Sequence, residues 1–224
     1  MKLPLKTLII LCLSLSFVNA QIKKDVGEFT TLKAFDLINI TLIESNKNSV
    51  EITGENANNV VIVNKNGTLK IRMNLEEIFD GDKTDVVLYH TGFEILDANE
   101  GAFIISKDRI AQRDIELKAQ EGGYIKVDLD VKDANIRAYS GGTVETHGNV
   151  NRQVVKVNTG GIYKGEQLNS VTCKLGISAG GESHIRASEL VDLKITAGGD
   201  AFIYGNPSTV NERKVIGGRV KRMD

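Results

Sequence analysis

The chain has 224 residues, of which 41% are hydrophobic, 25% charged and 5% aromatic, and its formal net charge is −1. A chain of this length can bury an adequate core, and the low aromatic content favours a core of aliphatic side chains. The near-neutral charge gives no sign of the strongly basic composition that is typical of nucleic-acid-binding proteins, and we predict no nucleic-acid partner.

Positions 1–20 have the three parts of a secretory signal peptide. Lys2 and Lys6 form a short basic region, an apolar run follows from Leu8 to Val18, and small residues end at Ala20. This run is too short to span a membrane as a helix of the mature protein. We therefore predict cleavage after Ala20, export to the periplasm, the cell surface or the extracellular space, and no transmembrane segment in the mature chain.

Cleavage also changes the cysteine content. It removes Cys12 and leaves Cys173 as the one cysteine, so that no disulfide can form within the mature chain. Cys173 falls on the apolar face of a predicted strand, together with Val171 and Leu175. We expect it to be buried as a small apolar residue.

The segment after the cleavage site lacks a regular repeat. We expect residues 21–34 to be a leader and residues 35–75 to be β-rich, since apolar and polar residues alternate in several short runs. Two of these runs flank Asn66-Gly67, which predicts a β-hairpin. This N-terminal segment is either an antiparallel module or a set of irregular first coils. The polar stretch from Leu75 to Thr84 marks its end.

That polar stretch contains an acidic loop. Asp80, Asp82 and Asp85 place three carboxylates within six residues, a composition that calcium favours. The twelve-residue spacing of a calcium-binding loop, with its terminal Glu, is absent. We expect a solvated loop and no metal site, and the sequence leaves calcium binding open.

Glycine returns at a nearly fixed interval over residues 85–220. The second residues of successive three-residue marks are Gly101, Gly123, Gly142, Gly161, Gly181, Gly199 and Gly218. These positions are 22, 19, 19, 20, 18 and 19 residues apart, which is typical of a repeat architecture. A corner with positive φ or very close backbone approach favours glycine, and stacking would repeat that corner in every layer.

Strand formers fill the intervals between these glycines. After Gly123, apolar Ile125, Val127 and Leu129 alternate with charged residues, the pattern of a strand buried on one face. About 19 residues hold two or three short strands, which is one coil of a parallel β-helix. We therefore predict an all-β fold, a parallel β-helix with a β-rich N-terminal segment. An antiparallel sandwich with regularly spaced turns is the alternative.

Outward carboxylates beside basic residues are the first candidates for chemistry. Parallel β-helix polysaccharide lyases and hydrolases use such groups on neighbouring coils. Asp128, Asp130 and Asp133, with Lys126 and Arg137, could imitate that arrangement.

Other chemistry-bearing residues show no clustering. His90, His147 and His184 are far apart, and Ser178 and Ser183 lack a nucleophile-elbow pattern. We therefore assign no catalytic, cofactor-binding or metal-binding residue.

The chain closes on a basic cluster. Its members are Arg213, Lys214, Arg219, Lys221 and Arg222. We interpret it as a charged cap of the last coil, which prevents pairing at an open edge. Contact with an anionic glycan or a lipid headgroup is the alternative.

Three features carry a resemblance to a known family. They are the repeated Gly-Gly marks, the turn and strand Asn66-Gly67-Thr68-Leu69, and the closing Ala201-Phe202-Ile203-Tyr204-Gly205-Asn206-Pro207. Over residues 35–220 the chain resembles the putative auto-transporter adhesin, head GIN domain family (the DUF2807 domain). The resemblance implies an exported or surface protein of a Gram-negative bacterium, built largely as a right-handed parallel β-helix, and it supplies no catalytic motif. The first mark, Glu100-Gly101, departs from the pattern.

Two hypotheses of function follow. The first is an exported, non-enzymatic surface or periplasmic protein for adhesion or for binding an extracellular glycan or protein, because a rigid solenoid displays repeated side chains to extended ligands. The alternative is a carbohydrate-active lyase or hydrolase, which requires a groove where carboxylates converge with Lys or Arg.

Overall fold

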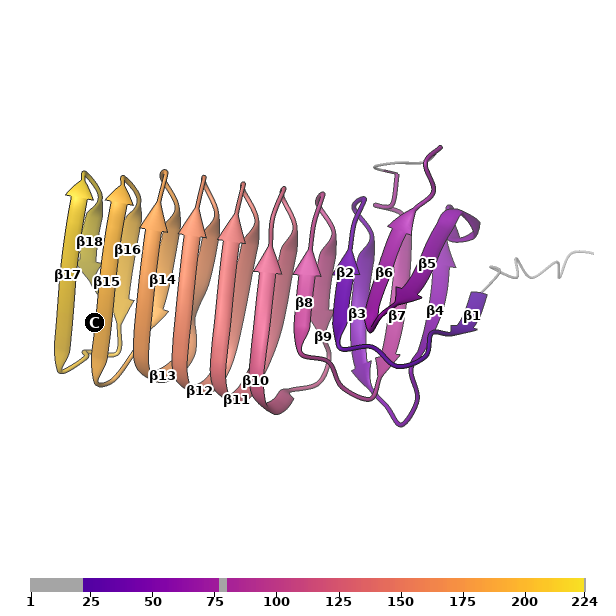
Figure 1. Ribbon diagram of the computed structural model, residues 1–224, viewed down its shortest axis with the longest axis horizontal. Helices are drawn as coiled ribbons and strands as arrows, with labels where there is room; N and C mark the ends of the chain where they lie inside the picture. Colours follow the sequence, from indigo (N-terminus) through magenta and orange to yellow (C-terminus); the bar gives the residue numbers. More distant parts are fainter. Residues whose placement is uncertain (1–21, 77–79, 224) are drawn as a thin grey trace, which may run out of the picture.

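The computed structural model describes residues 22–76 and 80–223, so the predicted signal peptide lies outside the described residues. The chain forms a β-solenoid of about seven turns with about 19 residues per turn. Figure 1 shows the turns stacked into a rod, with the C-terminal strands at one end. Neighbouring strands of the repeat region pair in parallel, which confirms the β-helix and contradicts the antiparallel sandwich.

The rod has two broad sheets, joined by a glycine corner on one side and a wider bend on the other. We call the sheet nearer the viewer in Figure 1 the front sheet and the other the back sheet. The front sheet contains β2 (Thr31–Ala34), β6 (Thr68–Met73), β8 (Ile95–Ala98), β10 (Ile110–Ala119), β15 (Leu190–Ala197) and β17 (Thr209–Ile216). The back sheet contains β3 (Asn39–Glu44), β7 (Thr84–His90), β9 (Phe103–Ser106), β14 (Glu182–Arg186), β16 (Asp200–Tyr204) and β18 (Arg219–Arg222). Three long strands contribute to both sheets and the bend, namely β11 (Tyr124–Tyr139), β12 (Thr143–Asn158) and β13 (Ile162–Ser178).

Aliphatic columns fill the interior between the two sheets. One column of the front sheet consists of the in-register residues Leu96, Leu117, Ile136, Val155 and Leu175, all buried. Burying a side chain of this size contributes about 1.5–3 kcal/mol. Because every layer repeats the same alternation, stacking these columns supplies the core of the rod.

Cys173 lies inside the rod, as the alternation predicts. It is free, and its burial raises the pKa of the thiol. Val171, expected on the same buried face, is instead 37% exposed. It follows the buried Ser170 near the bend, where the strict inward–outward alternation of the strand is interrupted.

The glycine corner is a two-residue turn. Ser140 and Gly141 both have positive φ, of 47° and 76°, and the Gly142 N–H donates to the Tyr139 carbonyl at 2.8 Å. Two successive positive φ values closed by such a bond make a type I′ turn, which favours glycine at its second central position.

The second glycine serves a different purpose at Gly123, Gly142 and Gly161. Gly142 does not have positive φ, but a Cβ there would lie 2.2 Å from the carbonyl oxygen of Ala119 in the adjacent turn of the rod. Gly123 and Gly161 face the same restriction, at 2.3 Å and 2.1 Å from a backbone oxygen. At these three marks the first glycine therefore permits the turn, and the second permits close stacking. At the last two marks the second glycines, Gly199 and Gly218, have positive φ themselves.

At the first glycine mark, the register of the strands differs from the one that the sequence suggests. Phe103 pairs with Tyr124, so Gly101 is equivalent to Gly122 and Ala102 occupies the place of the second glycine. The first step is therefore one residue shorter than the sequence alone suggests. In the turn before it, Asp36 and Leu37 make the same corner with φ of 58° and 63°.

The N-terminal segment combines the two alternatives left open by the sequence. β2, β3, β6 and β7 pair in parallel within the solenoid, whereas β4 (Ser49–Gly54) pairs antiparallel with β1 (Ile22–Asp25) and β7. After the 3₁₀ turn η3 (Ala57–Asn59), β5 (Val60–Lys65) and β6 form the predicted hairpin, with positive φ at Asn66 and Gly67. β1 and β2 thus replace the expected leader at residues 21–34.

The order of the first turns differs from their order in the sequence. The turn of β2 and β3 lies between the turn of β6 and β7 and the turn of β8 and β9. The chain must therefore pass the β2–β3 layer between β7 and β8.

Candidate functional site

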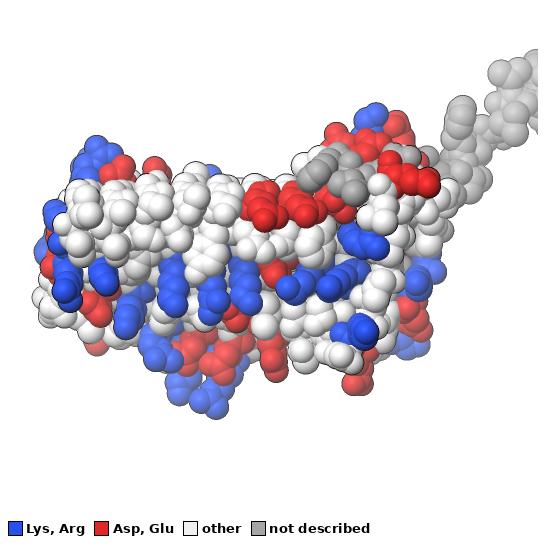
Figure 2. All heavy atoms as spheres, turned by 45° about the horizontal axis from the view of Figure 1, so that its top comes forward, with Lys and Arg blue, Asp and Glu red and all other residues white. Residues whose placement is uncertain are grey.

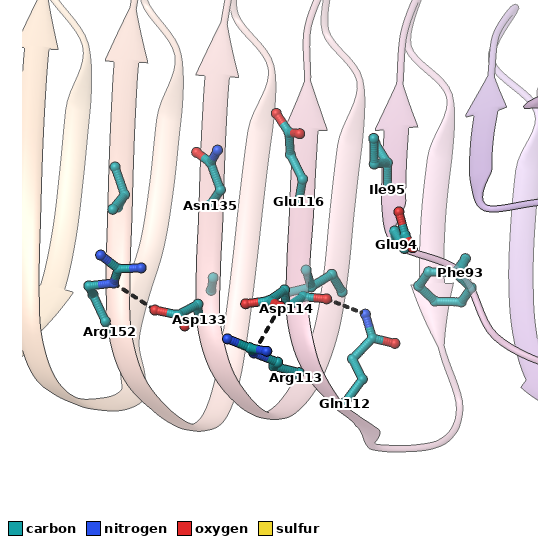
Figure 3. A pocket seen from close by; sticks show the side chains of 13 residues that line it. Phe93, Glu94, Ile95, Gln112, Arg113, Asp114, Glu116, Asp133, Asn135 and Arg152 are labelled. Carbon is teal, nitrogen blue, oxygen red and sulfur yellow. Dashed lines mark hydrogen bonds and ion pairs between the residues drawn. The ribbon is translucent and has the colours of Figure 1, made fainter.

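A groove of about 680 Å³ crosses the outer surface of the front sheet near the bend. The link between β7 and β8 contributes to one end of the groove. Figure 3 shows side chains from several successive strands along the rest of it. The lining residues are Phe93, Glu94, Ile95, Gln112, Arg113, Asp114, Ile115, Glu116, Asp133, Ala134, Asn135, Arg152 and Val154. Phe93 and Ile95 give the groove an apolar wall at one end.

Charged pairs occupy the rest of the groove. Asp133 accepts a hydrogen bond from the Arg152 Nε at 2.6 Å, and Arg113 lies 3.4 Å from Asp114. Both pairs are visible in Figure 3. Carboxylate acceptors and guanidinium donors side by side suit the hydroxyl and amide groups of a sugar or a peptide.

A column of nine in-register residues, seven of them basic, follows the front sheet along the rod, one residue from each strand. We call this column the basic ladder. In spatial order it comprises Lys70, Lys33, Asp97, Lys118, Arg137, Lys156, Gly176, Lys194 and Arg213. Figure 2 shows a row of basic side chains along this face. Neighbouring members lie one strand spacing apart, roughly 4.8 Å.

Carboxylates neutralise the ladder only toward its N-terminal end. Asp97 lies 3.1 Å from Lys33, and Glu116 lies 3.4 Å from Lys118 and 3.1 Å from Arg137. Within residues 22–76 and 80–223, the members from β12 onward have no carboxylate at ion-pair distance. Positive charge therefore accumulates toward β17.

The back sheet carries a hydrogen-bonded network around Glu145. Its carboxylate lies 2.8 Å from the Lys126 Nζ and 3.0 Å from the His147 Nε2, and it accepts a hydrogen bond from the Tyr124 hydroxyl. Partial burial would raise the pKa of Glu145, but these hydrogen bonds outweigh burial and lower the pKa to about 2. Partial burial of Tyr124 and its hydrogen bond with Glu145 raise the pKa of its phenol.

His184 belongs to a second cluster on the back sheet. Its ring stacks on Phe202 with centroids 4.5 Å apart, its Nε2 lies 2.9 Å from Glu182, and its Nδ1 lies 3.2 Å from the Tyr204 hydroxyl. Both His147 and His184 are thus fixed by a carboxylate two residues before them. These contacts orient the rings and leave the histidines separate from one another.

The predicted carboxylate constellation does not assemble. It comprised Asp128, Asp130, Asp133, Lys126 and Arg137. Lys126 belongs to the back sheet, and Asp128 pairs there with Arg109 at 3.0 Å. Asp133 and Arg137 face outward from the front sheet instead. Several carboxylates and arginines gather instead in the groove, which Asp114, Glu116, Asp133, Arg113 and Arg152 line together.

The acidic loop is held by polar contacts to its surroundings. The Asn56 side chain donates to the Asp80 carbonyl at 3.0 Å and to its carboxylate at 2.8 Å. Lys83 pairs with Glu55 at 3.0 Å, and Thr84 is buried. In the parts of the chain that the structure describes, no group of three His, Cys, Asp or Glu side chains is close enough to hold a metal ion.

His90 and Ser183 are both buried, which the sequence did not indicate. His90 packs edge-on against Phe93 at 4.7 Å and lines a smaller cavity beside the groove. Its burial lowers the pKa of the imidazole, although Glu44 and Asp108 oppose this. Ser178 is half-buried on the outer surface next to the corner.

The terminal basic cluster divides between the two faces of the last turn. Lys214 is the register partner of the buried Ile195, and Glu212 is the register partner of the buried Leu193, so both take inward positions on β17. The two form an ion pair at 2.8 Å. Arg219, on β18, pairs outward with Asp200 at 2.8 Å.

Sequence reasoning missed both the groove and the ladder. The ladder did leave a signal, because Lys118, Arg137, Lys156, Lys194 and Arg213 recur with the period of the glycine marks. The groove left none that could be recognised, since Phe93 approaches the repeats only through the link between β7 and β8.

The sequence matches a known protein family over most of its length. Residues 28–207 match the family described as "Putative auto-transporter adhesin, head GIN domain" (DUF2807). Among curated proteins, none matches the sequence significantly.

Three solved structures illustrate the likeness. A putative adhesin of Bacteroides fragilis NCTC 9343 has a TM-score of 0.83 at 16% identity, over 93% of this chain and 98% of its own. A putative adhesin of Parabacteroides merdae ATCC 43184 has a TM-score of 0.69 at 18% identity, over 92% and 96%. A putative lipid binding protein of Parabacteroides distasonis ATCC 8503 has a TM-score of 0.69 at 16% identity, over 93% and 98%. At these identities the likeness shows a shared fold.

Proposed function

Because the chain belongs to the putative auto-transporter adhesin, head GIN domain family, we propose that it is an exported, non-enzymatic protein that binds an extracellular glycan or protein through its front sheet. The groove carries this proposal. It is concave, it combines the apolar wall of Phe93 and Ile95 with charged pairs, and it is continuous with a regular array of outward side chains. Binding sites commonly combine such apolar walls with a few placed polar groups.

The location of the protein is part of the same proposal. The predicted signal peptide and the family support export to the periplasm, the cell surface or the medium. Among the described residues, no helix is long and apolar enough to cross a membrane. Mass spectrometry of the exported protein should find Gln21 at its N-terminus, and a retained Met1 would refute cleavage.

The test of function is a glycan array and a pull-down of surface proteins with the mature chain. Arg152→Glu reverses the charge at the groove and should reduce binding of any captured ligand by about tenfold, equivalent to ~1.4 kcal/mol. Lys164→Glu makes the same charge change at an exposed position of the back sheet and should leave binding unchanged. Equal losses in both variants, or no ligand at all, would refute the proposal.

A carbohydrate-active enzyme is the second candidate, favoured by the convergence of Asp114, Glu116 and Asp133 with arginines in the groove. Incubation with acidic and neutral polysaccharides, followed by measurement of new reducing ends, tests it. Turnover that Asp133→Asn abolishes would establish the enzyme and overturn the non-enzymatic reading.

A further inference from the structure

Gly176 lies in the interior of β13 without a backbone reason to be glycine. Its φ is not in the positive region, and a Cβ there would meet no atom within 4 Å. The register of β13 against its neighbours is regular at this position. Glycine inside a strand usually marks a bulge, a tight bend or the close approach of a ligand or another backbone. The first two are absent at Gly176, and no backbone of the described residues covers it.

Unneutralised cations border this opening. Lys156 and Lys194 are the register partners of Gly176 on the two adjacent strands, and Lys174 precedes it by two residues on the same face. Arg213 continues the ladder on β17. No carboxylate of the described residues lies at ion-pair distance from these four side chains. One exposed carboxylate lies beside them, that of Asp192, the register partner of Lys174 on β15.

We propose that the basic ladder from Lys156 to Arg213, with the notch at Gly176, binds an extended acidic polysaccharide that carries one carboxylate or sulfate on each sugar. Lys194 and Arg213 are one strand step apart, roughly 4.8 Å, a distance comparable with the length of one pyranose ring. Lys156 and Lys194 are two steps apart, with the notch at Gly176 between them. The notch leaves room for a ring to approach the sheet where a side chain would otherwise stand. This inference rests on the proposed function and names the chemical class of its ligand.

The composition of the surface favours a polysaccharide over other polyanions. Single-stranded nucleic acid is bound by aromatic platforms between the cations. From β12 onward, the described in-register members of the two columns beside the ladder are Val154, Lys174, Asp192 and Asn211 on one side and Asn158 and Ser178 on the other, with no aromatic ring among them. The nearest ring in these columns, Tyr139, lies one strand earlier on β11. An anionic membrane favours an apolar face that inserts between headgroups. The ladder and its notch offer a straight polar track instead.

The experiment measures binding of polygalacturonate to the mature chain by biolayer interferometry at low and high salt. The parent should bind, more weakly at high salt because the contacts are exposed charges. Galacturonate monomer should bind on the order of a hundredfold more weakly than the polymer, since the ladder engages several anions at once. Dextran of similar length, a neutral polymer, should not bind.

Variants locate the site. The triple variant Lys156→Gln, Lys194→Gln, Arg213→Gln should bind polygalacturonate about tenfold more weakly. Its matched control, Lys132→Gln, Lys164→Gln, Lys221→Gln, removes the same charge from exposed residues elsewhere and should bind within about twofold of the parent. Gly176→Leu keeps all charges but fills the notch, and it should weaken binding without lowering the melting temperature.

Each other outcome overturns the inference. Equal weakening of the two triple variants would show unspecific attraction, and unchanged binding by Gly176→Leu would remove the notch from the site. Binding of anionic vesicles or single-stranded DNA in place of polygalacturonate would assign the ladder to another partner. If polygalacturonate fails while a ligand that depends on Arg152 is captured, this inference falls and the proposed function stands.

Discussion

Gly142→Ala tests whether close stacking at the corner requires the second glycine. The added Cβ would lie 2.2 Å from the Ala119 carbonyl oxygen, 2.3 Å from its carbonyl carbon and 2.6 Å from the Gln120 nitrogen. All three atoms belong to the backbone of the adjacent turn, so no side-chain rotation can relieve the contact. Ordinary contact requires separations of at least about 3.4 Å, so that the two turns would have to separate locally by roughly 1 Å.

Such a separation acts on the hydrogen bonds between turns. The Thr143 N–H donates to the Gly123 carbonyl at 2.8 Å, directly beside the clash. Forced overpacking of a close-packed interior costs about 1–3 kcal/mol, and loss of one buried hydrogen bond adds about 1–3 kcal/mol. We therefore expect Gly142→Ala to reduce the free energy of unfolding by about 3 kcal/mol. Ala102 occupies the equivalent place two corners earlier, so the turn itself accepts a Cβ.

Gly141→Ala is the matched control, made one residue earlier in the same turn. Gly141 has φ of 76°, but a Cβ there would meet no atom within 4 Å, so the cost is only that of the left-handed conformation, about 1–2 kcal/mol. Urea denaturation of the two variants beside the parent measures both effects. Equal losses at Gly141 and Gly142 would refute the stacking explanation and leave only turn conformation.

Three further predictions concern polar groups that are buried or half-buried. Burial lowers the pKa of His90, so unfolding takes up a proton and the free energy of unfolding should fall as the pH decreases through the ordinary value of 6.5. His90→Gln should flatten this dependence of the free energy of unfolding on pH in urea titrations, and an unchanged dependence would contradict the prediction. Burial and a hydrogen bond with Asp36 raise the pKa of Glu100, so its negative charge opposes folding at neutral pH. Glu100→Gln should therefore raise the melting temperature at pH 7, with little gain below pH 4.5, and a lower melting temperature at pH 7 would contradict this prediction. Tyr163→Phe removes the hydroxyl that donates to the Gln153 Oε1 at 3.0 Å inside the rod, and it should lower the free energy of unfolding, measured by calorimetry, by about 1–3 kcal/mol. An unchanged free energy of unfolding would mean that the Gln153 amide finds another partner.

The repeat region could be predicted because its signals are local. The alternation of apolar residues sets which face is buried, and the glycine period sets the length of a turn. Both follow from backbone geometry that every layer repeats. The corner formed by Asp36 and Leu37 escaped notice because neither residue is glycine, although both adopt positive φ. The order of the first turns could not be read either, since it depends on pairings such as β2 with β8.

The candidate site could be predicted only in part. To predict the ladder, one must know that residues one period apart lie side by side on neighbouring strands. The glycine period already implied this for Lys118, Arg137 and Lys156. The groove depends on where the link from β7 places Phe93, which no periodic pattern encodes. The enzyme hypothesis pointed to carboxylates of two different sheets because a strand as long as β11 passes through both sheets.

The C-terminal end of the rod shows how an open stack of strands avoids growing further. β17 continues the inward columns, but it places Glu212 and Lys214 where the preceding strand has Leu193 and Ile195. Inward charges at an edge resist addition of another strand, because a new layer would have to bury them. Glu212→Leu with Lys214→Ile should therefore produce concentration-dependent association in light scattering, with a larger apparent mass than the parent at about 100 µM. Arg213→Leu, an outward change on the same strand, should not. If the double variant keeps the mass of the parent, the charged pair does not protect this end.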